Sequence, residues 1–154
     1  MDKRDVARLL EEIAVLLELK GENTFKIRAY ENASRVIDGL TEDLGSLIEA
    51  GTLTELNGIG VAIAGKIKEL WTTGRMSYYD DLAASIPPGY LEMIRVPGLG
   101  AKKVRALGEG LGITTLAKLK RAAEKGEIRE LEGFGAQAEK KILEGIALLE
   151  AGAG

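Results

Sequence analysis

Three short stretches of this 154-residue sequence repeat one device, in which two glycines flank a single large apolar residue. In each copy, apolar residues also lie two positions before the first glycine and nine positions after it. The copies are Gly58-Ile59-Gly60 with Leu56 and Ile67, Gly98-Leu99-Gly100 with Val96 and Leu107, and Gly133-Phe134-Gly135 with Leu131 and Ile142. Matching flanks at irregular separations indicate one motif used three times rather than a solenoid.

The chemistry that such a turn offers is phosphate binding. Glycine tolerates positive φ, so two glycines permit a tight reversal between short helices. Without side chains, the backbone N–H groups stay bare beside the N-terminus of the next helix, where the macrodipole also favours an anion. We therefore predict phosphate cradles that recognise no base. The cations available on the following helices are Lys66 and Lys68, then Lys102, Lys103 and Arg105, then Lys140 and Lys141.

This arrangement is the helix–hairpin–helix motif, a binder of DNA backbone without sequence preference. The second copy has the densest run of cations and is the best candidate for a duplex phosphate. In the third copy the lysines lie further along, and Phe134 suggests a more structural role. A tight helical turn can use glycine for steric reasons alone, but three copies favour at least one functional hairpin.

Helices must position these turns, because helical spacing recurs along the chain and no stretch sustains the alternation of a strand. Apolar residues three and four apart mark a first helix from Val6 to Leu17 and a second from Ile27 to Ile37. Thr41 is the predicted N-cap of a third helix, with Glu42 and Asp43 in its first turn. The fold class is therefore predicted to be all-α, with tandem helix–hairpin–helix turns.

Pro87 and Pro88 form the clearest break in the chain. We predict two small helical domains, residues 1–86 with the first hairpin and residues 87–154 with the second and third. The net charge of −3 argues at first against a nucleic-acid partner, but it is −4 over residues 1–50, −1 over 51–90 and +2 over 91–154. A basic face must therefore be local, and it belongs to the C-terminal half.

The composition excludes several kinds of chemistry. The sequence contains no cysteine and no histidine, which removes disulfides, thiolate and imidazole metal sites, and serine–histidine triads. Its N-terminus is too charged for a signal peptide, and no apolar run approaches the ~20 residues of a membrane helix. We expect a cytoplasmic, nucleoid-associated monomer without a metal site or a cofactor.

Nearly the whole chain resembles the N-terminal region of bacterial family X DNA polymerases. The stretches that carry the resemblance are "LLEEIAVLLELKGENTFKIRAYENASRVI", "LTELNGIGVAIAGKIKELWTTGR", "IPPGYLEMIRVPGLGAKKVRALGEGLGITTLAKLKRAAEKGEIRELEGFG" and "KKILEGI". The resemblance implies a small lyase-type domain followed by a DNA-binding fingers domain. The family's palm, with its Gly-Ser opening and strand-borne carboxylates, would begin after residue 154, so no polymerase activity is expected of this chain.

The resemblance also implies a lyase site. In the family, a lysine amine attacks the aldehyde of a 5′-deoxyribose phosphate, forms a Schiff base and permits β-elimination. The matching nucleophile is Lys66, while Lys26 and Tyr30 match the pocket for the 5′-phosphate. Their i,i+4 spacing places Lys26 and Tyr30 on one helix face. A Na⁺ or K⁺ ion at hairpin carbonyls is a further implication of the family.

Departures from the family leave the function open. Val61 and Ala62 stand where relatives carry a lysine, Thr54 stands where vertebrate relatives are basic, and Tyr78 replaces another lysine. Without the family, Lys66 is an ordinary solvated lysine, and Tyr30 and Phe25 are core residues. We expect a binder of gapped or nicked duplex DNA. The alternatives are a 5′-deoxyribose phosphate lyase that uses Lys66, and a helix–hairpin–helix scaffold for protein interaction.

Overall fold

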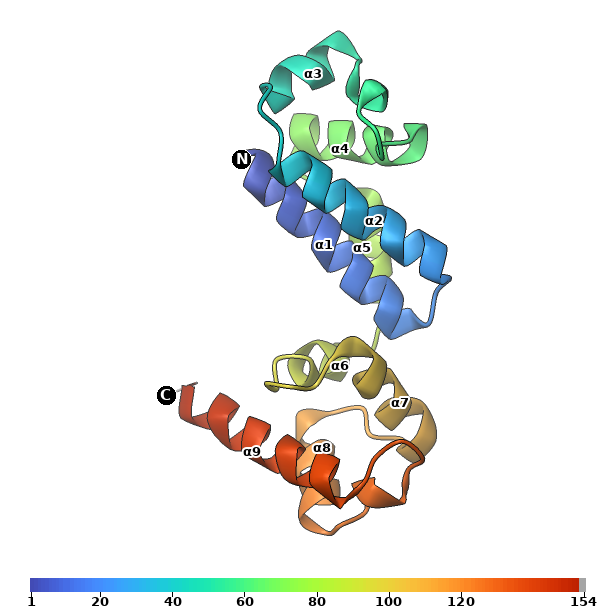
Figure 1. Ribbon diagram of the computed structural model, residues 1–154, viewed down its shortest axis with the longest axis vertical. Helices are drawn as coiled ribbons and strands as arrows, with labels where there is room; N and C mark the ends of the chain where they lie inside the picture. Colours follow the sequence, from blue (N-terminus) through green and yellow to red (C-terminus); the bar gives the residue numbers. More distant parts are fainter. Residues whose placement is uncertain (153–154) are drawn as a thin grey trace. The chain divides into compact units, whose positions relative to one another are not determined.

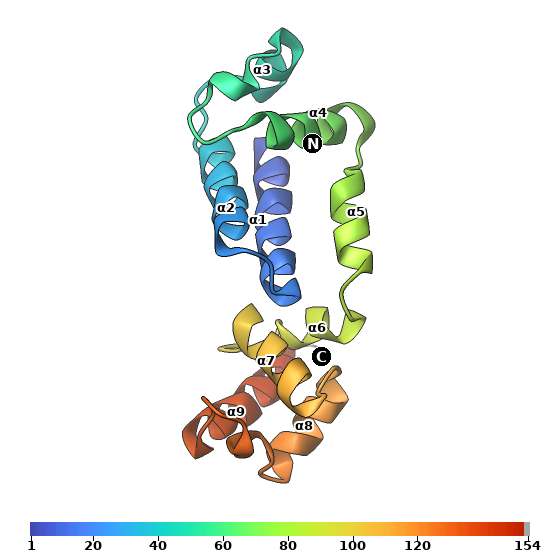
Figure 2. The ribbon, with the colours of Figure 1, turned by 90° about the vertical axis from the view of Figure 1, so that its right-hand side faces the viewer.

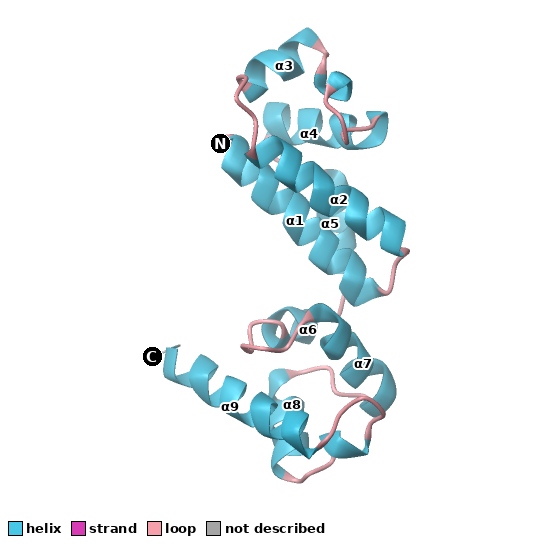
Figure 3. Cartoon of the chain, in the orientation of Figure 1, coloured by secondary structure: helices cyan, strands magenta, loops and turns pink. Residues whose placement is uncertain are grey.

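The computed structural model describes residues 1–152, and within that range every element is helical (Figures 1 and 3). The prediction of an all-α fold is confirmed. The α-helices are α1 (Lys3–Lys20), α2 (Thr24–Asp38), α3 (Leu44–Ala50), α4 (Val61–Thr73), α5 (Ser77–Ala84), α6 (Pro88–Met93), α7 (Ala101–Leu111), α8 (Leu116–Glu124) and α9 (Ala136–Gly152). Two single-turn 3₁₀ helices, η1 (Leu53–Glu55) and η2 (Ile128–Glu130), precede the first and third glycine pairs.

The chain divides into two compact units, residues 1–85 and the part from Ile86 onward. The division falls one residue before the boundary expected from Pro87 and Pro88. The first unit holds α1 to α5 and the first hairpin, and the second holds α6 to α9 with the other two hairpins. Each unit has its own buried apolar core, with Leu10, Ile13, Leu17, Ile37 and Ile67 in the first and Met93, Val104, Leu107, Leu119, Ile128 and Ile146 in the second.

An antiparallel pair of helices, α1 and α2, forms the body of the first unit (Figure 2). The sequence fixes the start of each helix by a side-chain cap: Asp2 accepts hydrogen bonds from the amides of Arg4 and Asp5, and Asn23 accepts one from Phe25. Such caps satisfy N–H groups that the helix itself leaves unpaired. Helices α4 and α5 both pack against α1, which brings the first hairpin onto this pair.

The predicted start of the third helix is wrong by two residues. Helix α3 begins at Leu44, and its N-cap is Asp43 rather than Thr41. The carboxylate of Asp43 accepts hydrogen bonds from the amide and the hydroxyl of Ser46, at 3.0 Å and 2.9 Å. Thr41 instead donates its hydroxyl hydrogen to Glu42. A charged cap with two donors within reach prevails over a threonine that is further from the helix.

Candidate nucleic-acid interface

The three hairpins share one backbone geometry. The first glycine of each pair lies in the left-handed region, with φ of 98° at Gly58, 84° at Gly98 and 89° at Gly133. The next residue donates its amide hydrogen to the carbonyl three positions earlier, at 3.1, 3.0 and 3.0 Å for Ile59, Leu99 and Phe134. Those three side chains are buried, so each turn is anchored to a core by its central residue.

The second glycine of each pair serves a different purpose from the first. Gly60 and Gly100 have φ near −80° and ψ near 170°, an extended backbone that any residue adopts (φ −82°, ψ 174°; φ −83°, ψ 171°). The expectation that both glycines relieve backbone strain is therefore wrong for these two. A Cβ atom at Gly60, Gly100 or Gly135 would meet nothing within 4 Å. The described fold does not need these residues to be glycine. The absence of a side chain at these positions therefore favours access of a ligand to the backbone of the turn.

The helices that follow the first two hairpins begin without a side-chain cap. No side chain in the described part of the chain caps α4 at Gly60 or α7 at Gly100. By contrast, α1, α2, α3 and α8 are capped by Asp2, Asn23, Asp43 and Thr115. The first-turn amides of α4 and α7 are thus open in the sense that no side chain caps them, and they lie at the positive end of a helix dipole, which suits an anion.

The predicted cations lie around these helix starts to different degrees. Lys102 and Lys103 are exposed in the first turn of α7, and Arg105 is half-buried in the next. In the third hairpin, Lys140 and Lys141 are exposed in the second turn of α9. The first hairpin has no cation in its first turn, where Val61 is 82% exposed. The second hairpin therefore combines the open amides with the nearest positive charge.

The second and third hairpins are joined by a reciprocal contact that sequence reasoning missed. A Cβ atom at Gly145 of α9 would lie 2.6 Å from the carbonyl oxygen of Pro97 and 2.7 Å from Val96 Cγ1. A Cβ atom at Gly110 of α7 would lie 2.5 Å from Leu131 Cδ1. Each helix thus uses a glycine to admit the loop of the other hairpin.

The sequence offered a signal for this contact. Both glycines lie twelve positions after the first glycine of their own hairpin, since 110 − 98 and 145 − 133 are equal, whereas the first hairpin has Leu70 there. Val96 and Leu131 are themselves equivalent residues, two positions before the glycine pair. The second and third hairpins therefore form one structural pair, and the first hairpin stands apart from it.

An ion pair that is buried only on its carboxylate side holds the third hairpin closed, since the side chain of Arg129 is 54% exposed. Glu139 of α9 is 3% exposed, and it accepts hydrogen bonds from the amide, Nε and Nη2 of Arg129 at 3.1, 3.1 and 2.7 Å. These bonds tie η2 to the first turn of α9 across the glycine pair. The Arg129 guanidinium holds the pKa of Glu139 below its usual value.

We expect this ion pair to make the second unit sensitive to acid. A depressed pKa in the folded state means that the stabilisation is present above the ordinary glutamate pKa and is lost as the pH falls through the folded value. Glu139→Gln should therefore lower the thermal unfolding midpoint at pH 7 and flatten its fall below about pH 5. Circular dichroism melts of both proteins from pH 3 to pH 7 measure this; parallel curves would contradict it.

In the first unit, the structure brings together the residues predicted for a lyase site. The ring of Tyr78 from α5 stacks on Tyr30 of α2, with centroids 5.8 Å apart and planes 6° from parallel. The ammonium groups of Lys66 and Lys26 lie over the same Tyr78 ring, 4.7 and 5.6 Å from its centroid. Burial and then Tyr78 raise the pKa of Tyr30 above its ordinary value. Both lysines therefore contact the same aromatic ring, that of Tyr78.

Tyr78 is the residue of this cluster that sequence reasoning did not place in the site. In the sequence it stands out only as a departure from a family lysine. Its hydroxyl oxygen is buried and has no hydrogen-bond partner among the described residues. Buried hydroxyl groups are nearly always bonded, so an unpaired one on the ring that both ammonium groups contact favours a polar ligand there.

Phe25 is not a core residue, and that prediction is wrong. Its side chain is 80% exposed. The buried face of α2 is formed by Ile27, Tyr30, Ala33, Ser34 and Ile37, and a helix places residue 25 on the opposite side. Tyr30, by contrast, is 4% exposed, as expected of a core residue.

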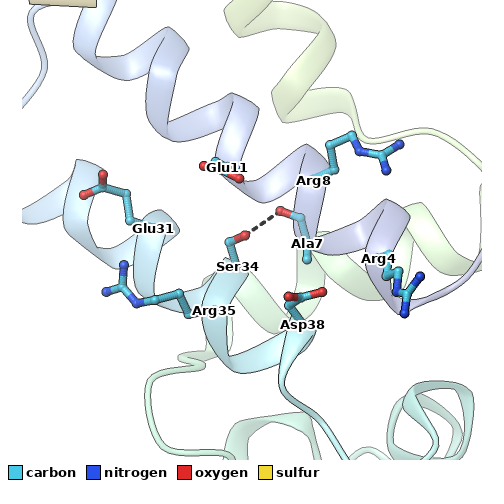
Figure 4. Close-up of a pocket in the computed structure, with 8 residues that line it drawn as sticks. All are labelled: Arg4, Ala7, Arg8, Glu11, Glu31, Ser34, Arg35 and Asp38. Atoms are coloured by element: carbon cyan, nitrogen blue, oxygen red, sulfur yellow. Dashed lines mark hydrogen bonds between the residues drawn. The ribbon is translucent and has the colours of Figure 1, made fainter.

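A charged groove on α1 and α2 offers no comparable site for a polyanion. It encloses about 370 Å³, and Ser34 closes its floor by donating to the carbonyl of Ala7 at 2.7 Å (Figure 4). Its charged lining consists of three arginines and three carboxylates: Arg4, Arg8, Arg35, Glu11, Glu31 and Asp38. Because these charges cancel, the groove lacks the positive field that attracts DNA.

The fold and the three hairpins define a helix–hairpin–helix protein, and comparison with known proteins agrees. Residues 1–76 match the model of a helix-hairpin-helix domain, and residues 90–147 match that of a SAM-like helix-hairpin-helix tandem. The tandem match covers the second and third hairpins, which the reciprocal glycines join. Residues 1–152 contain no helix that is long and apolar enough to cross a membrane.

More particularly, the chain is similar to the N-terminal helix–hairpin–helix region of a bacterial PolX. It is 40% identical over 152 residues to the DNA polymerase/3′-5′ exonuclease PolX of Bacillus subtilis. The alignment covers 99% of this chain and 26% of that relative. The chain thus spans about a quarter of the relative's length.

Proposed function

We propose that this chain binds the backbone of gapped or nicked duplex DNA without reading its sequence. The observation that carries the proposal is the second glycine of the first two hairpins, which the fold leaves free to be any residue and which leaves the first-turn amides without a side-chain cap. Open amides, a helix dipole and nearby lysines bind phosphate but no base edge. The relative from Bacillus subtilis is named as a DNA polymerase, which agrees with a DNA ligand.

Binding should be weak and strongly dependent on salt. The excess of negative charge in residues 1–50 repels DNA at long range, and few cations flank the hairpins. We expect micromolar affinity at physiological salt and a slope of log K against log salt near −3, for release of counterions from ~3–4 phosphates. Fluorescence anisotropy on a labelled gapped duplex over a salt series, with two unrelated sequences, measures both.

The outcomes of that titration separate the candidate functions. Equal affinity for the two sequences with a negative salt slope supports backbone binding. A strong sequence preference contradicts it, and the absence of binding at low salt favours a scaffold for protein partners. Tighter binding when the gap carries a 5′-phosphate would add a ligand for Lys26.

A Na⁺ or K⁺ ion at the hairpin carbonyls is also part of this proposal. The carbonyl oxygen of Val96 accepts one hydrogen bond within the turn and keeps a second lone pair that can bind a cation.

A second candidate function, a 5′-deoxyribose phosphate lyase, is favoured by the cluster around Tyr78. The amine of Lys66 would attack the sugar aldehyde and form a Schiff base with loss of water. Loss of a C2′ proton and cleavage of the C3′–O bond, a β-elimination, would then release the downstream strand with a phosphate at its new 5′ end, and hydrolysis of the remaining Schiff base would restore the amine of Lys66. Lys26 and the unpaired hydroxyl of Tyr78 would bind the 5′-phosphate. The attack needs a neutral amine, whereas the contact of Lys66 with the ring involves the charged ammonium. The attack on the aldehyde and the contact with the ring thus require opposite charge states of Lys66.

Trapping with borohydride tests the lyase directly. On an incised abasic duplex, the wild-type chain should give a covalent adduct that Lys66→Ala abolishes. Tyr78→Phe keeps the ring and removes the hydroxyl. It should reduce about tenfold the amount by which a 5′-phosphate increases adduct formation, which is the value of one hydrogen bond to a charged group. Lys68→Ala is the matched control, because Lys68 is an exposed lysine on the same helix. An adduct that survives Lys66→Ala would remove Lys66 from the role.

A further inference from the structure

A small cavity lies between the second and third hairpins. It encloses about 180 Å³. Hairpin two contributes Pro97, Gly98 and Lys103, and hairpin three contributes Phe134, Gln137, Ala138, Lys141 and Ile142. The cavity thus exists only because the two hairpins are packed as a pair. Neither of the two matching domain descriptions names a ligand for this cavity.

The lining of this inter-hairpin cavity combines apolar residues with two lysines. Phe134, Ala138, Ile142 and the ring of Pro97 supply apolar surface, whereas Lys103 and Lys141 supply two exposed ammonium groups. Gln137 adds an amide that can donate or accept. None of the eight lining residues is acidic. This combination suits a ligand with one anionic group and one small apolar face.

The size and position of the cavity narrow the ligand further. Pockets for free small molecules usually begin near ~300 Å³, so a cavity of 180 Å³ is better matched to one unit of a polymer. Gly98 lines the cavity and also forms the turn that leads to the open amides of α7. A strand whose phosphate lies on those amides would therefore continue past the cavity mouth.

We propose that the inter-hairpin cavity holds one sugar-phosphate unit of a bound DNA strand, with a single phosphate shared by Lys103 and Lys141. The apolar face of the deoxyribose lies against Phe134 and Ile142. This inference rests on the proposed DNA binding and adds to it that the second and third hairpins bind as one unit. The reciprocal contacts at Gly110 and Gly145 hold the two walls in place before any ligand arrives.

A double-mutant cycle on the gapped duplex tests the shared phosphate. Lys103→Gln and Lys141→Gln should each weaken binding about five- to tenfold, and the double variant should be little weaker than either. The salt slope counts the phosphates that a protein neutralises, at about 1 for each phosphate. The double variant should therefore lose about 1 from the slope, where two separate phosphates would cost about 2. The full 154-residue chain is used throughout.

Lys118→Gln is the matched control, because Lys118 is an exposed lysine of α8 in the same unit and does not line the cavity. It should change the affinity less than twofold, and all four variants should melt at the wild-type temperature. Additive losses, or a Lys141→Gln variant that behaves like Lys118→Gln, would overturn the shared phosphate while DNA binding by the wild type stands. If the wild type itself does not bind at low salt, both proposals fall.

Discussion

Replacing Gly100 by aspartate should leave the protein fully folded and lower its affinity for DNA at least tenfold. The backbone at Gly100 is extended, and a Cβ atom there meets nothing within 4 Å, so the substitution introduces no strain. Aspartate is a strong N-cap, and its carboxylate would accept hydrogen bonds from the first-turn amides of α7. It would thereby occupy the donors that a phosphate needs and would repel the phosphate by its charge.

Gly100→Asp should change the folding stability and the DNA affinity in opposite directions. An N-cap aspartate in place of glycine should stabilise the helix by a few tenths of a kcal/mol. Losing hydrogen bonds to a charged phosphate should cost about 1.5–3 kcal/mol of binding free energy, which corresponds to roughly 10- to 150-fold in the dissociation constant. Thermal melts and anisotropy titrations on the same samples measure the two effects. Equal affinity of Gly100→Asp and wild type would remove the second hairpin from the interface.

Thr115→Asp provides the matched control for this variant. Thr115 is the N-cap of α8, in the same unit, and its hydroxyl already accepts a hydrogen bond from the amide of Lys118 at 3.1 Å. The control therefore adds the same charge at the same kind of helix position, without touching a hairpin. A loss of affinity confined to Gly100→Asp identifies the open cradle, and similar losses in both variants would indicate a general effect of charge.

Sequence reasoning predicted those features that depend on local spacing. Helices follow from apolar residues three and four apart, and the hairpins follow from the repeated glycine pair. The two glycines of a pair were not distinguished, because only coordinates show that Gly98 has φ of 84° and Gly100 an ordinary backbone. Local rules also placed Phe25 in the core, since an aromatic residue next to a helical pattern is usually buried.

Features that depend on residues far apart in the chain could not be predicted in this way. Tyr78 is more than fifty positions from Lys26, and only the packing of α5 and α4 on α1 and α2 brings its ring to both lysines. The pair of glycines at Gly110 and Gly145 is an intermediate case. Their equal offset was visible in the sequence, but its meaning required knowledge of the residues that each one faces.

Gly145→Ala should destabilise the second unit, even though alanine is the better helix former. The new Cβ atom would lie 2.6 Å from a backbone carbonyl oxygen and 2.7 Å from the buried Val96, so the loop of the second hairpin would have to move. Overpacking of this kind costs about 1–3 kcal/mol, and helix propensity returns up to about 1 kcal/mol. We expect a net loss of about 1–2 kcal/mol, or roughly 5–15 °C in the unfolding midpoint of a unit this small.

Two alanine variants turn this expectation into a test of the hairpin pair. Gly65→Ala, in α4 where a Cβ atom meets nothing within 4 Å, should stabilise the first unit by about 0.5–1 kcal/mol. Gly110→Ala should cost less than Gly145→Ala, because it meets the end of the Leu131 side chain, which can rotate away. If the hairpins bind DNA as one unit, Gly145→Ala should also weaken binding below its own melting range. A stable Gly145→Ala with unchanged affinity would mean that the loop of the second hairpin yields freely, and that neither its contact with α9 nor the cavity beside it is fixed.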